Sequence, residues 1–257
     1  MIKITFLGTG TSQGIPIIGS KHPVCLSDDP KDKRLRVSIS LAWDDYFFVI
    51  DCGPDFRQQM LNSNARSLDG IVFTHEHADH TAGLDDIRPF FFRQGKINMH
   101  MSTRVQMALK KRFDYILNDE NKYPGAPSVA IQSIDKNTPF QLGNKTVTPV
   151  EVIHQKMSVL GYRIDDFAYL TDVKTITKEE KAKLNNLEVL VVNALRIEPH
   201  PSHLNLDEAL TLIEELNPKR AYLTHISHLL GFHAEVEKTL PEHVFIAYDN
   251  LEITTSL

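Results

Sequence analysis

The segment that most constrains this chain is a short apolar run followed at once by a polar cluster. Residues 70–73 read Gly-Ile-Val-Phe, and residues 75–80 read His-Glu-His-Ala-Asp-His. The apolar run predicts a buried strand, and a strand that ends in a tight loop can direct imidazoles and a carboxylate toward one point. Imidazole nitrogens and carboxylate oxygens suit zinc, manganese or iron. The sequence therefore predicts a metal site at a strand end rather than a solvated polar loop.

The spacing within this cluster separates two groups of ligands. His75 and His77 are two residues apart, so both lie on the same side of an extended segment and can bind one ion together. Asp79 and His80 follow directly and can reach a second ion. One more histidine and a shared carboxylate would complete a two-metal site. The candidates, each of which follows a predicted strand, are His154, Asp172 and His225.

Composition narrows the class of protein. The 257 residues are 42% apolar and 24% charged, which is enough apolar material for a core on two faces of a sheet. The net charge of −5 provides no general basic field that would recruit nucleic acid. Cys25 and Cys52 are too few for a disulfide framework. Neither a signal peptide nor an apolar span long enough to cross a membrane is evident, so we expect a soluble cytoplasmic protein.

Alternating and apolar runs predict an α/β protein. The expected strands are residues 2–7, 37–43, 46–51, 70–74, 97–100, 140–142, 146–154, 159–164, 167–171, 189–194, 220–224 and 244–247. The expected helices are residues 54–62, 80–92, 103–117, 178–184 and 206–216, and residues 118–128 are expected to form a loop. Hairpin strands followed by helices occur in each half with no Pro/Ser-rich linker between them, which predicts two facing sheets with helices packed outside.

The order of the candidate ligands resembles the metallo-β-lactamase fold superfamily. The chain carries H-x-H-x-D-H after an apolar strand, then a later His, a later Asp and a final His, and the opening Gly-Thr-Gly-Thr-Ser of residues 8–12 matches as well. The resemblance implies a single domain over residues 1–257, folded as a four-layer αββα sandwich of two mixed sheets flanked by helices. It implies a first metal on His75, His77 and His154, a second on Asp79, His80 and His225, and Asp172 bridging both.

The resemblance is strongest to the branch that contains phosphoribosyl cyclic phosphodiesterases and, more distantly, ribonuclease Z. The segments that carry it are residues 8–16, 193–203 and 223–228. That branch implies a metal-dependent phosphodiesterase that hydrolyses a small, cyclic or nucleotide-like phosphodiester through a hydroxide bridging two divalent ions. Zinc, manganese and iron all suit the ligand set. Asp79 is then expected to accept the proton of the nucleophile, and His203 to bind phosphate and act as general acid. His203 could instead orient the following helix, and His200 is expected to be a bystander.

Other functions stay open at this point. A thioesterase or lactonase of the same fold would share the ligands, and a scaffold could keep the fold without activity. A ribonuclease Z-like nuclease would need a protruding Gly/Pro-rich arm, which this acidic chain lacks. Nucleic acid and membrane partners are therefore not expected, and a small phosphodiester is. The chain gives no clear signal of its oligomeric state, so a homodimer is left open.

A further metal site is suggested by the same resemblance. Relatives in this branch carry G-C-x-C-x-x-C after the Gly-rich loop, and these thiols, with a late histidine, hold a structural zinc. This chain reads Gly-Ser-Lys-His-Pro-Val-Cys over residues 19–25, so the remaining candidates are His22, Cys25 and His228. The sequence favours neither a bound metal nor an empty site at these three residues. Asp51, at the end of a strand, is expected to hold a ligand histidine in the right tautomer.

Overall fold

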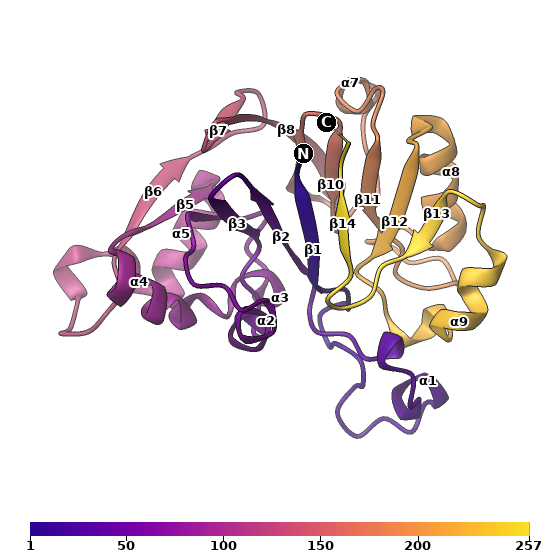
Figure 1. The fold of residues 1–257 in the computed structure, drawn as a ribbon, viewed down its shortest axis with the longest axis horizontal. Coiled ribbons are helices and arrows are strands. Elements are labelled where there is room, and N and C mark those ends of the chain that lie inside the picture. Colours follow the sequence, from indigo (N-terminus) through magenta and orange to yellow (C-terminus); the bar gives the residue numbers. More distant parts are fainter. Residues whose placement is uncertain (257) are drawn as a thin grey trace.

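The structure is a computed structural model that describes residues 1–256, the side chain of residue 119 excepted. Over these residues the chain forms two seven-stranded sheets that face each other, with helices packed on both outer faces (Figure 1). The two mixed sheets and their flanking helices confirm the expected αββα sandwich. No helix in the described part of the chain is long and apolar enough to span a membrane.

The first sheet has the strand order β14-β1-β2-β3-β4-β5-β6. Its strands are β1 (Lys3–Gly8), β2 (Ser38–Trp43), β3 (Tyr46–Ile50), β4 (Gly70–Val72), β5 (Ile97–Met101), β6 (Val129–Ser133) and β14 (Glu252–Thr254). The second sheet has the order β13-β12-β11-β10-β9-β8-β7. Its strands are β7 (Phe140–Leu142), β8 (Lys145–His154), β9 (Met157–Ile164), β10 (Phe167–Leu170), β11 (Val189–Asn193), β12 (Arg220–Thr224) and β13 (Val244–Ile246).

Each sheet contains a parallel half and an antiparallel half. Strands β3 to β6 run parallel to one another, as do β10 to β13. The pairs β14-β1, β1-β2, β2-β3, β7-β8, β8-β9 and β9-β10 are antiparallel. Because the carboxyl ends of parallel strands meet at one edge of a sheet, the loops that follow them are brought together there.

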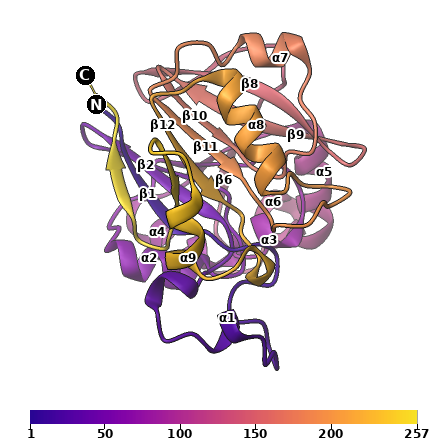
Figure 2. The same ribbon diagram turned by 90° about the vertical axis from the view of Figure 1, so that its right-hand side faces the viewer.

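Helices cover the outer faces, as the two perpendicular views show (Figures 1 and 2). Those beside the first sheet are α2 (Phe56–Ser63), α3 (Ala78–Thr81), η2 (Leu84–Ile87), α4 (Arg88–Gln94), α5 (Thr103–Arg112), α6 (Asp114–Leu117) and η3 (Asp119–Asn121). Those of the second half are α7 (Lys178–Ala182), α8 (Leu206–Leu216), η4 (His228–Leu230), α9 (His233–Val236) and η5 (Glu237–Thr239). The segment with α1 (Pro23–Leu26) and η1 (Pro30–Asp32) projects from the body (Figure 1).

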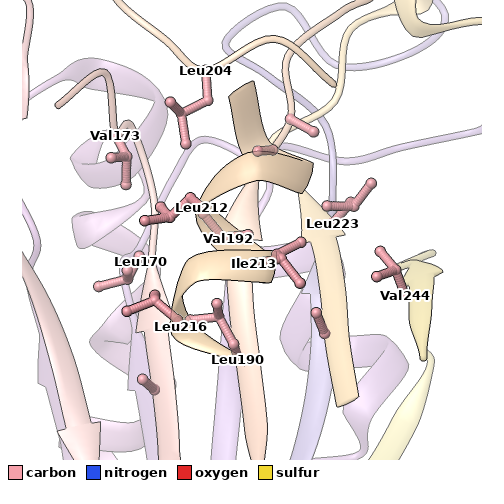
Figure 3. Close-up of a cluster of buried hydrophobic side chains, with 14 of the residues drawn as sticks. Leu170, Val173, Leu190, Val192, Leu204, Leu212, Ile213, Leu216, Leu223 and Val244 are labelled. Atoms are coloured by element: carbon pink, nitrogen blue, oxygen red, sulfur yellow. The ribbon is translucent and has the colours of Figure 1, made fainter. Parts of the chain in front are cut away.

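Three apolar clusters hold these layers together. One lies between the sheets and includes Phe6 and Tyr169, both fully buried. A second lies under α2, α4 and α5 on the first sheet. In the third, Leu212 and Leu216 of α8 pack against the second sheet, where Val192 is buried (Figure 3). Helix α8 forms here because Asn205 and Glu208 make a reciprocal capping box at its start.

The structure corrects several expected elements. Residues 80–92 are not one helix but the three short helices α3, η2 and α4, because the Gly83 N–H bonds to the Cys52 carbonyl at 2.9 Å instead of continuing the turn. The helix expected to reach residue 117 breaks at Phe113, whose φ of −131° is not helical. Helix α2 begins at Phe56, after Pro54 rather than with it. Strands β6 and β14 were not expected, and both lie at a sheet edge.

Candidate metal centre

The seven expected ligands are carried by four strand ends. Residues 75, 77, 79 and 80 follow β4, His154 ends β8, Asp172 follows β10 and His225 follows β12. Asp172 and His225 take φ angles of 58° and 54°, a left-handed conformation that is unfavourable for residues with a Cβ. Such backbone strain persists only where the surrounding structure imposes it, and it concentrates at functional sites. The chain turns sharply at both strand ends and thereby directs these side chains into the edge between the sheets.

The three histidines that are expected to hold the first metal lie close to one another. The ring centroids of His75 and His77 lie 4.6 Å apart, those of His77 and His154 5.3 Å, and those of His75 and His154 6.0 Å. His154 donates its Nδ1–H to the Ser202 carbonyl oxygen at 2.8 Å, which leaves Nε2 for the site. The three rings thus lie near one another, whereas the compact group of ligand atoms that contains His154 joins it to Asp172 and His203.

The second group lies next to the first and shares Asp172 with it. The Asp79 carboxylate Oδ2 lies 3.5 Å from Nε2 of His80 and 3.7 Å from Nε2 of His225. Asp172 contacts the same two rings through its two oxygens, at 3.2 Å to His80 and 3.4 Å to His225. Asp172 also forms a compact group with His75 and His80, in which all ligand atoms lie within 4.8 Å of one another. The structure therefore places His75, His80, His154 and His225 at Asp172, with Asp79 beside His80 and His225. His77 contacts the rings of His75 and His154 instead, and the assignment of all seven residues as metal ligands stays a prediction.

The donor set fits divalent cations. Nε2 of His75, Nε2 of His80 and both ring nitrogens of His225 are buried without a hydrogen-bond partner. Buried polar atoms are normally paired, so several orphaned nitrogens that face carboxylates indicate a missing positive partner. Burial lowers the pKa of His75 and of His77, which keeps both rings in the neutral form that binds metals.

The carboxylates and imidazoles of the site shift one another's pKa values. Burial would raise the pKa of Asp172, but His225 and His80 outweigh that effect and lower it well below its usual value. Burial would likewise lower the pKa of His80, yet Asp172, Asp79 and Asp51 raise it well above its usual value. A proton on His80 thus occupies the place of a cation, which would displace it on binding.

A second layer of contacts orients the ligands. Nδ1 of His80 lies 2.7 Å from the Asp51 carboxylate, so its Nε2 faces the site. The same carboxylate accepts hydrogen bonds from the N–H and the hydroxyl of Thr74, both at 2.8 Å. The Thr74 hydroxyl in turn lies 3.0 Å from Nδ1 of His75. The contact between Asp51 and a ligand histidine is the one expected from the sequence.

His203 lies inside this centre rather than at its rim. Its Nε2 is 3.0 Å from Oδ1 of Asp172, and its ring stacks on that of His225 with centroids 5.0 Å apart. Burial lowers the pKa of His203 to about 4, although its hydrogen bond to Asp172 opposes that effect. Ser202 and His200 both contact His203. The sequence did not indicate these contacts, because neither residue follows a strand and neither has the spacing of a metal ligand.

Two of the three residues of the suggested structural zinc site, His22 and His228, lie next to each other. The rings of His22 and His228 meet edge to face at 4.7 Å. However, Nδ1 of His22 accepts a hydrogen bond from the Val24 N–H at 3.3 Å, where it caps α1. Cys25 is buried in a small apolar cluster with Ile15 and Val24. A zinc at this position stays a prediction.

Comparison with known proteins decides the family. A model of the β-lactamase superfamily domain matches residues 46–226 of this chain. The chain belongs to the metallo-β-lactamase superfamily. A crystal structure of a diphosphatase from the PhnP family is 36% identical and superposes with a TM-score of 0.93, covering 100% of this chain and 99% of that one. Human tRNase Z, short form, is 17% identical with a TM-score of 0.70, covers 99% of this chain and 100% of that one, and shows the fold alone.

Curated relatives are longer than this chain. A protein named octanoyltransferase from Porphyromonas gingivalis is 37% identical over 98% of this chain, which spans 51% of that protein. A ribonuclease Z of Methanococcus maripaludis is 26% identical over 85% of this chain, which spans 61% of it. The chain therefore spans about half to three-fifths of the length of these relatives. The comparisons support the branch that contains PhnP-type and ribonuclease Z-like proteins.

Proposed function

We propose that this protein is a metal-dependent phosphodiesterase that hydrolyses a small phosphodiester, cyclic or nucleotide-like, with two divalent ions. The first ion would be held by His75, His77 and His154, whose rings adjoin one another, with Asp172 shared. The second would be held by Asp79, His80 and His225, whose ligand atoms form a compact group. When bound, the ions would activate the attacking water and offset the charge that builds on the phosphate oxygens. Zinc and manganese suit these ligands best, and iron is acceptable.

The observation that carries the proposal is the position of His203. A histidine whose Nε2 lies 3.0 Å from the shared carboxylate of Asp172 is within reach of a phosphate held at the same centre. The relatives point the same way, since two of them are named for reactions at phosphorus, a diphosphatase and a ribonuclease Z. Neither an arm for gripping RNA nor a basic surface was expected from the sequence, so a small substrate is favoured over a polymer.

The residues of the chain would divide the proton transfers between them. The Asp79 carboxylate, ionised because His80 and His225 lower its pKa against the effect of burial, would accept the proton of the attacking nucleophile. Nε2 of His203 would bind a phosphate oxygen and then donate a proton to the leaving oxygen. A neutral His203 is a weak acid, but an anionic phosphate beside Nε2 favours the protonated ring.

Acyl hydrolysis is the second candidate. It is favoured by one observation, the relative named octanoyltransferase that matches nearly the whole chain. The superfamily uses the same ligands for several reactions, so the ligands alone do not separate an ester of phosphate from one of a carboxylic acid. The cytoplasmic location, a homodimer and the identity of the metal all stay predictions.

A direct comparison of substrates tests the proposal. The protein is reloaded with zinc or with manganese and assayed with bis(p-nitrophenyl) phosphate and with an octanoyl thioester. We expect turnover of the phosphodiester and its loss in the His203→Ala variant, which removes the contact with the phosphate as well as the acid, with metal content unchanged. Turnover of the thioester alone would overturn the phosphodiesterase assignment in favour of acyl hydrolysis.

A further inference from the structure

His200 stands outside the ligand set but touches the residue on which the proposed function depends. Its Nδ1 lies 3.2 Å from Nδ1 of His203, and the two ring centroids are 5.1 Å apart. The hydroxyl of Ser202 lies between them, 3.2 Å from Nδ1 of His200 and 3.0 Å from Nδ1 of His203. His200 is half-buried and lies between two prolines.

The hydrogen bonds around these rings fix which nitrogen carries a hydrogen. The backbone N–H of Ser202 donates to Nδ1 of His200 at 3.3 Å, so this nitrogen is an acceptor. Two bare ring nitrogens 3.2 Å apart would repel each other, so this contact needs a hydrogen on Nδ1 of His203. The Asp172 carboxylate can only accept, so its contact with Nε2 needs a hydrogen on that nitrogen as well, and the protonated ring makes both contacts at once. The Ser202 hydroxyl oxygen, 3.0 Å from Nδ1 of His203, can accept from the same N–H.

We propose that His200 is a positioning residue that accepts the Nδ1–H of His203 and thereby holds Nε2 of His203 toward the shared carboxylate and the substrate phosphate. This inference rests on the proposed function of His203. When Nε2–H of His203 breaks and the leaving oxygen takes the proton, the neutral ring keeps its hydrogen on Nδ1. That product is the tautomer that His200 accepts, so the same contact serves before and after the transfer.

The loop that carries His200 is built to hold this geometry. Nη2 of Arg196 donates to the Pro199 carbonyl at 2.7 Å, and the Leu204 N–H donates to the Val173 carbonyl at 2.7 Å, one residue after Asp172. The carbonyl of Ser202 also accepts from Nδ1 of the ligand His154. One short loop therefore orients a metal ligand through its backbone and the phosphate-binding histidine through His200.

Two substitutions separate positioning from general structural support. His200→Ala removes the acceptor, whereas His200→Asn keeps one, because an Asn side-chain oxygen can stand near the place of Nδ1. His243→Ala serves as a matched control, since His243 precedes β13 at the opposite, amino end of the parallel strands. Metal content is measured in every variant, because the loop also contacts His154.

The readout is the dependence of kcat on the leaving group. Methyl phosphodiesters with p-nitrophenol and with unsubstituted phenol are compared, because only the poorer leaving group needs a well-placed acid. For His200→Ala we expect kcat to fall about 10- to 100-fold with phenol and less than about threefold with p-nitrophenol, with KM nearly unchanged. His200→Asn should recover most of the loss, and His243→Ala should match wild type.

Several outcomes would overturn the inference. An equal fall of kcat on both substrates, an unchanged kcat on both, or failure of His200→Asn to rescue would each remove the positioning role. A second measurement does not depend on activity: in the zinc-loaded wild type, ring ¹⁵N NMR should show hydrogen on Nδ1 of His203, and a bare Nδ1 would contradict the proposal. If the wild type hydrolyses neither phosphodiester, the proposed function fails instead.

Discussion

At the scale of single residues, Asp51 shows how one buried carboxylate organises the metal centre. It contacts Nδ1 of His80 and both polar groups of Thr74, and it takes a left-handed φ of 64° directly after β3. Burial raises the pKa of Asp51, and the adjacent His80 opposes that effect. The Asp51 carboxylate therefore needs the His80 imidazole to stay ionised, and the imidazole needs the carboxylate to keep its orientation.

The Asp51→Asn variant tests this dependence. The amide keeps the shape of the side chain but loses the charge that fixes the His80 tautomer, so we expect metal affinity to fall about 10- to 100-fold while the fold is kept. Competition with a chelator measures the affinity, and the exposed Asp45→Asn in the β2-β3 turn is the control. Wild-type affinity in Asp51→Asn would show that the contact is dispensable.

At the residue scale, the sequence could predict which side chains lie together where they are close in sequence or directly follow a strand. The cluster at residues 75–80 could be read because its spacing itself places imidazoles together, and Asp51 could be read because it ends a strand. His200 could not, because its contact with His203 depends on how the loop between two prolines folds back. Nothing in the residue types of that loop separates a partner from a bystander.

At the scale of elements, two glycines allow the segment of residues 75–83 that follows β4 to pack against the loop that follows β3. A Cβ on Gly53 would lie 2.1 Å from the Asp79 carbonyl oxygen, and a Cβ on Gly83 would lie 2.1 Å from the Gly53 carbonyl oxygen. These are backbone atoms, which cannot move aside as a flexible side chain can. Helix α3 therefore reaches its position only because both glycines lack a side chain.

The Gly53→Ala variant should displace α3 together with the ligands that it carries. We expect a loss of stability on the order of 1–3 kcal/mol, as for other overpacked sites, together with weaker metal binding. Gly19→Ala is the control: its φ of 74° is also left-handed, but nothing lies within 4 Å of the added Cβ. That control should lose stability without losing metal. Thermal unfolding and metal titration measure the two effects, and equal metal affinity in both variants would refute the displacement.

Helices and strands could be predicted where local sequence patterns alone determine them, and not where contacts distant in sequence intervene. The hairpin of β2 and β3 and helix α8 match their expected ranges to within a residue, because alternation and a capping box are local. The expected helix over residues 80–92 was wrong because a contact with Cys52, distant in sequence, ends it. Strand β6 was missed because its five residues are half-buried or exposed and follow a loop rich in Pro and Gly.

At the scale of the whole molecule, a buried polar network joins the two ends of the chain. Nη1 of Arg34 donates to the Thr9 hydroxyl at 2.7 Å and to the Ala247 carbonyl at 2.5 Å. The Asp249 carboxylate accepts from the Thr9 hydroxyl at 2.8 Å and from the Leu35 N–H at 2.6 Å. The layers could be predicted from the sequence, but a contact across 240 positions could not, because no local pattern encodes it.

The charge of Asp249 gives a prediction about pH. Burial raises its pKa from 3.8 to about 6, so the folded protein binds a proton there that the unfolded chain has released. The stability contributed by this group is complete below about pH 4 and is lost as the pH rises through about 6. Relative to Asp249→Asn, the wild type should therefore lose up to about 3 kcal/mol between these values, at roughly 1.4 kcal/mol per pKa unit.

Urea unfolding of both proteins in the metal-free form at pH 4, 5, 6 and 7 measures this difference. Removing metal beforehand prevents its release at low pH from contributing to the curves. The free energy of unfolding of the wild type minus that of Asp249→Asn should fall as the pH rises. A difference that is constant or that rises over this range would contradict the burial of an ionisable Asp249.

The number of divalent ions bound per chain tests the central claim most directly, because the whole account depends on four strand ends forming one two-metal centre. The protein is stripped, reloaded with zinc, dialysed and analysed for metal beside the Asp172→Ala variant. The account predicts two ions per chain in the wild type and loss of tight binding of both when the shared carboxylate is removed. A wild type that retains no ion after reloading, or an Asp172→Ala variant that retains two, would contradict it.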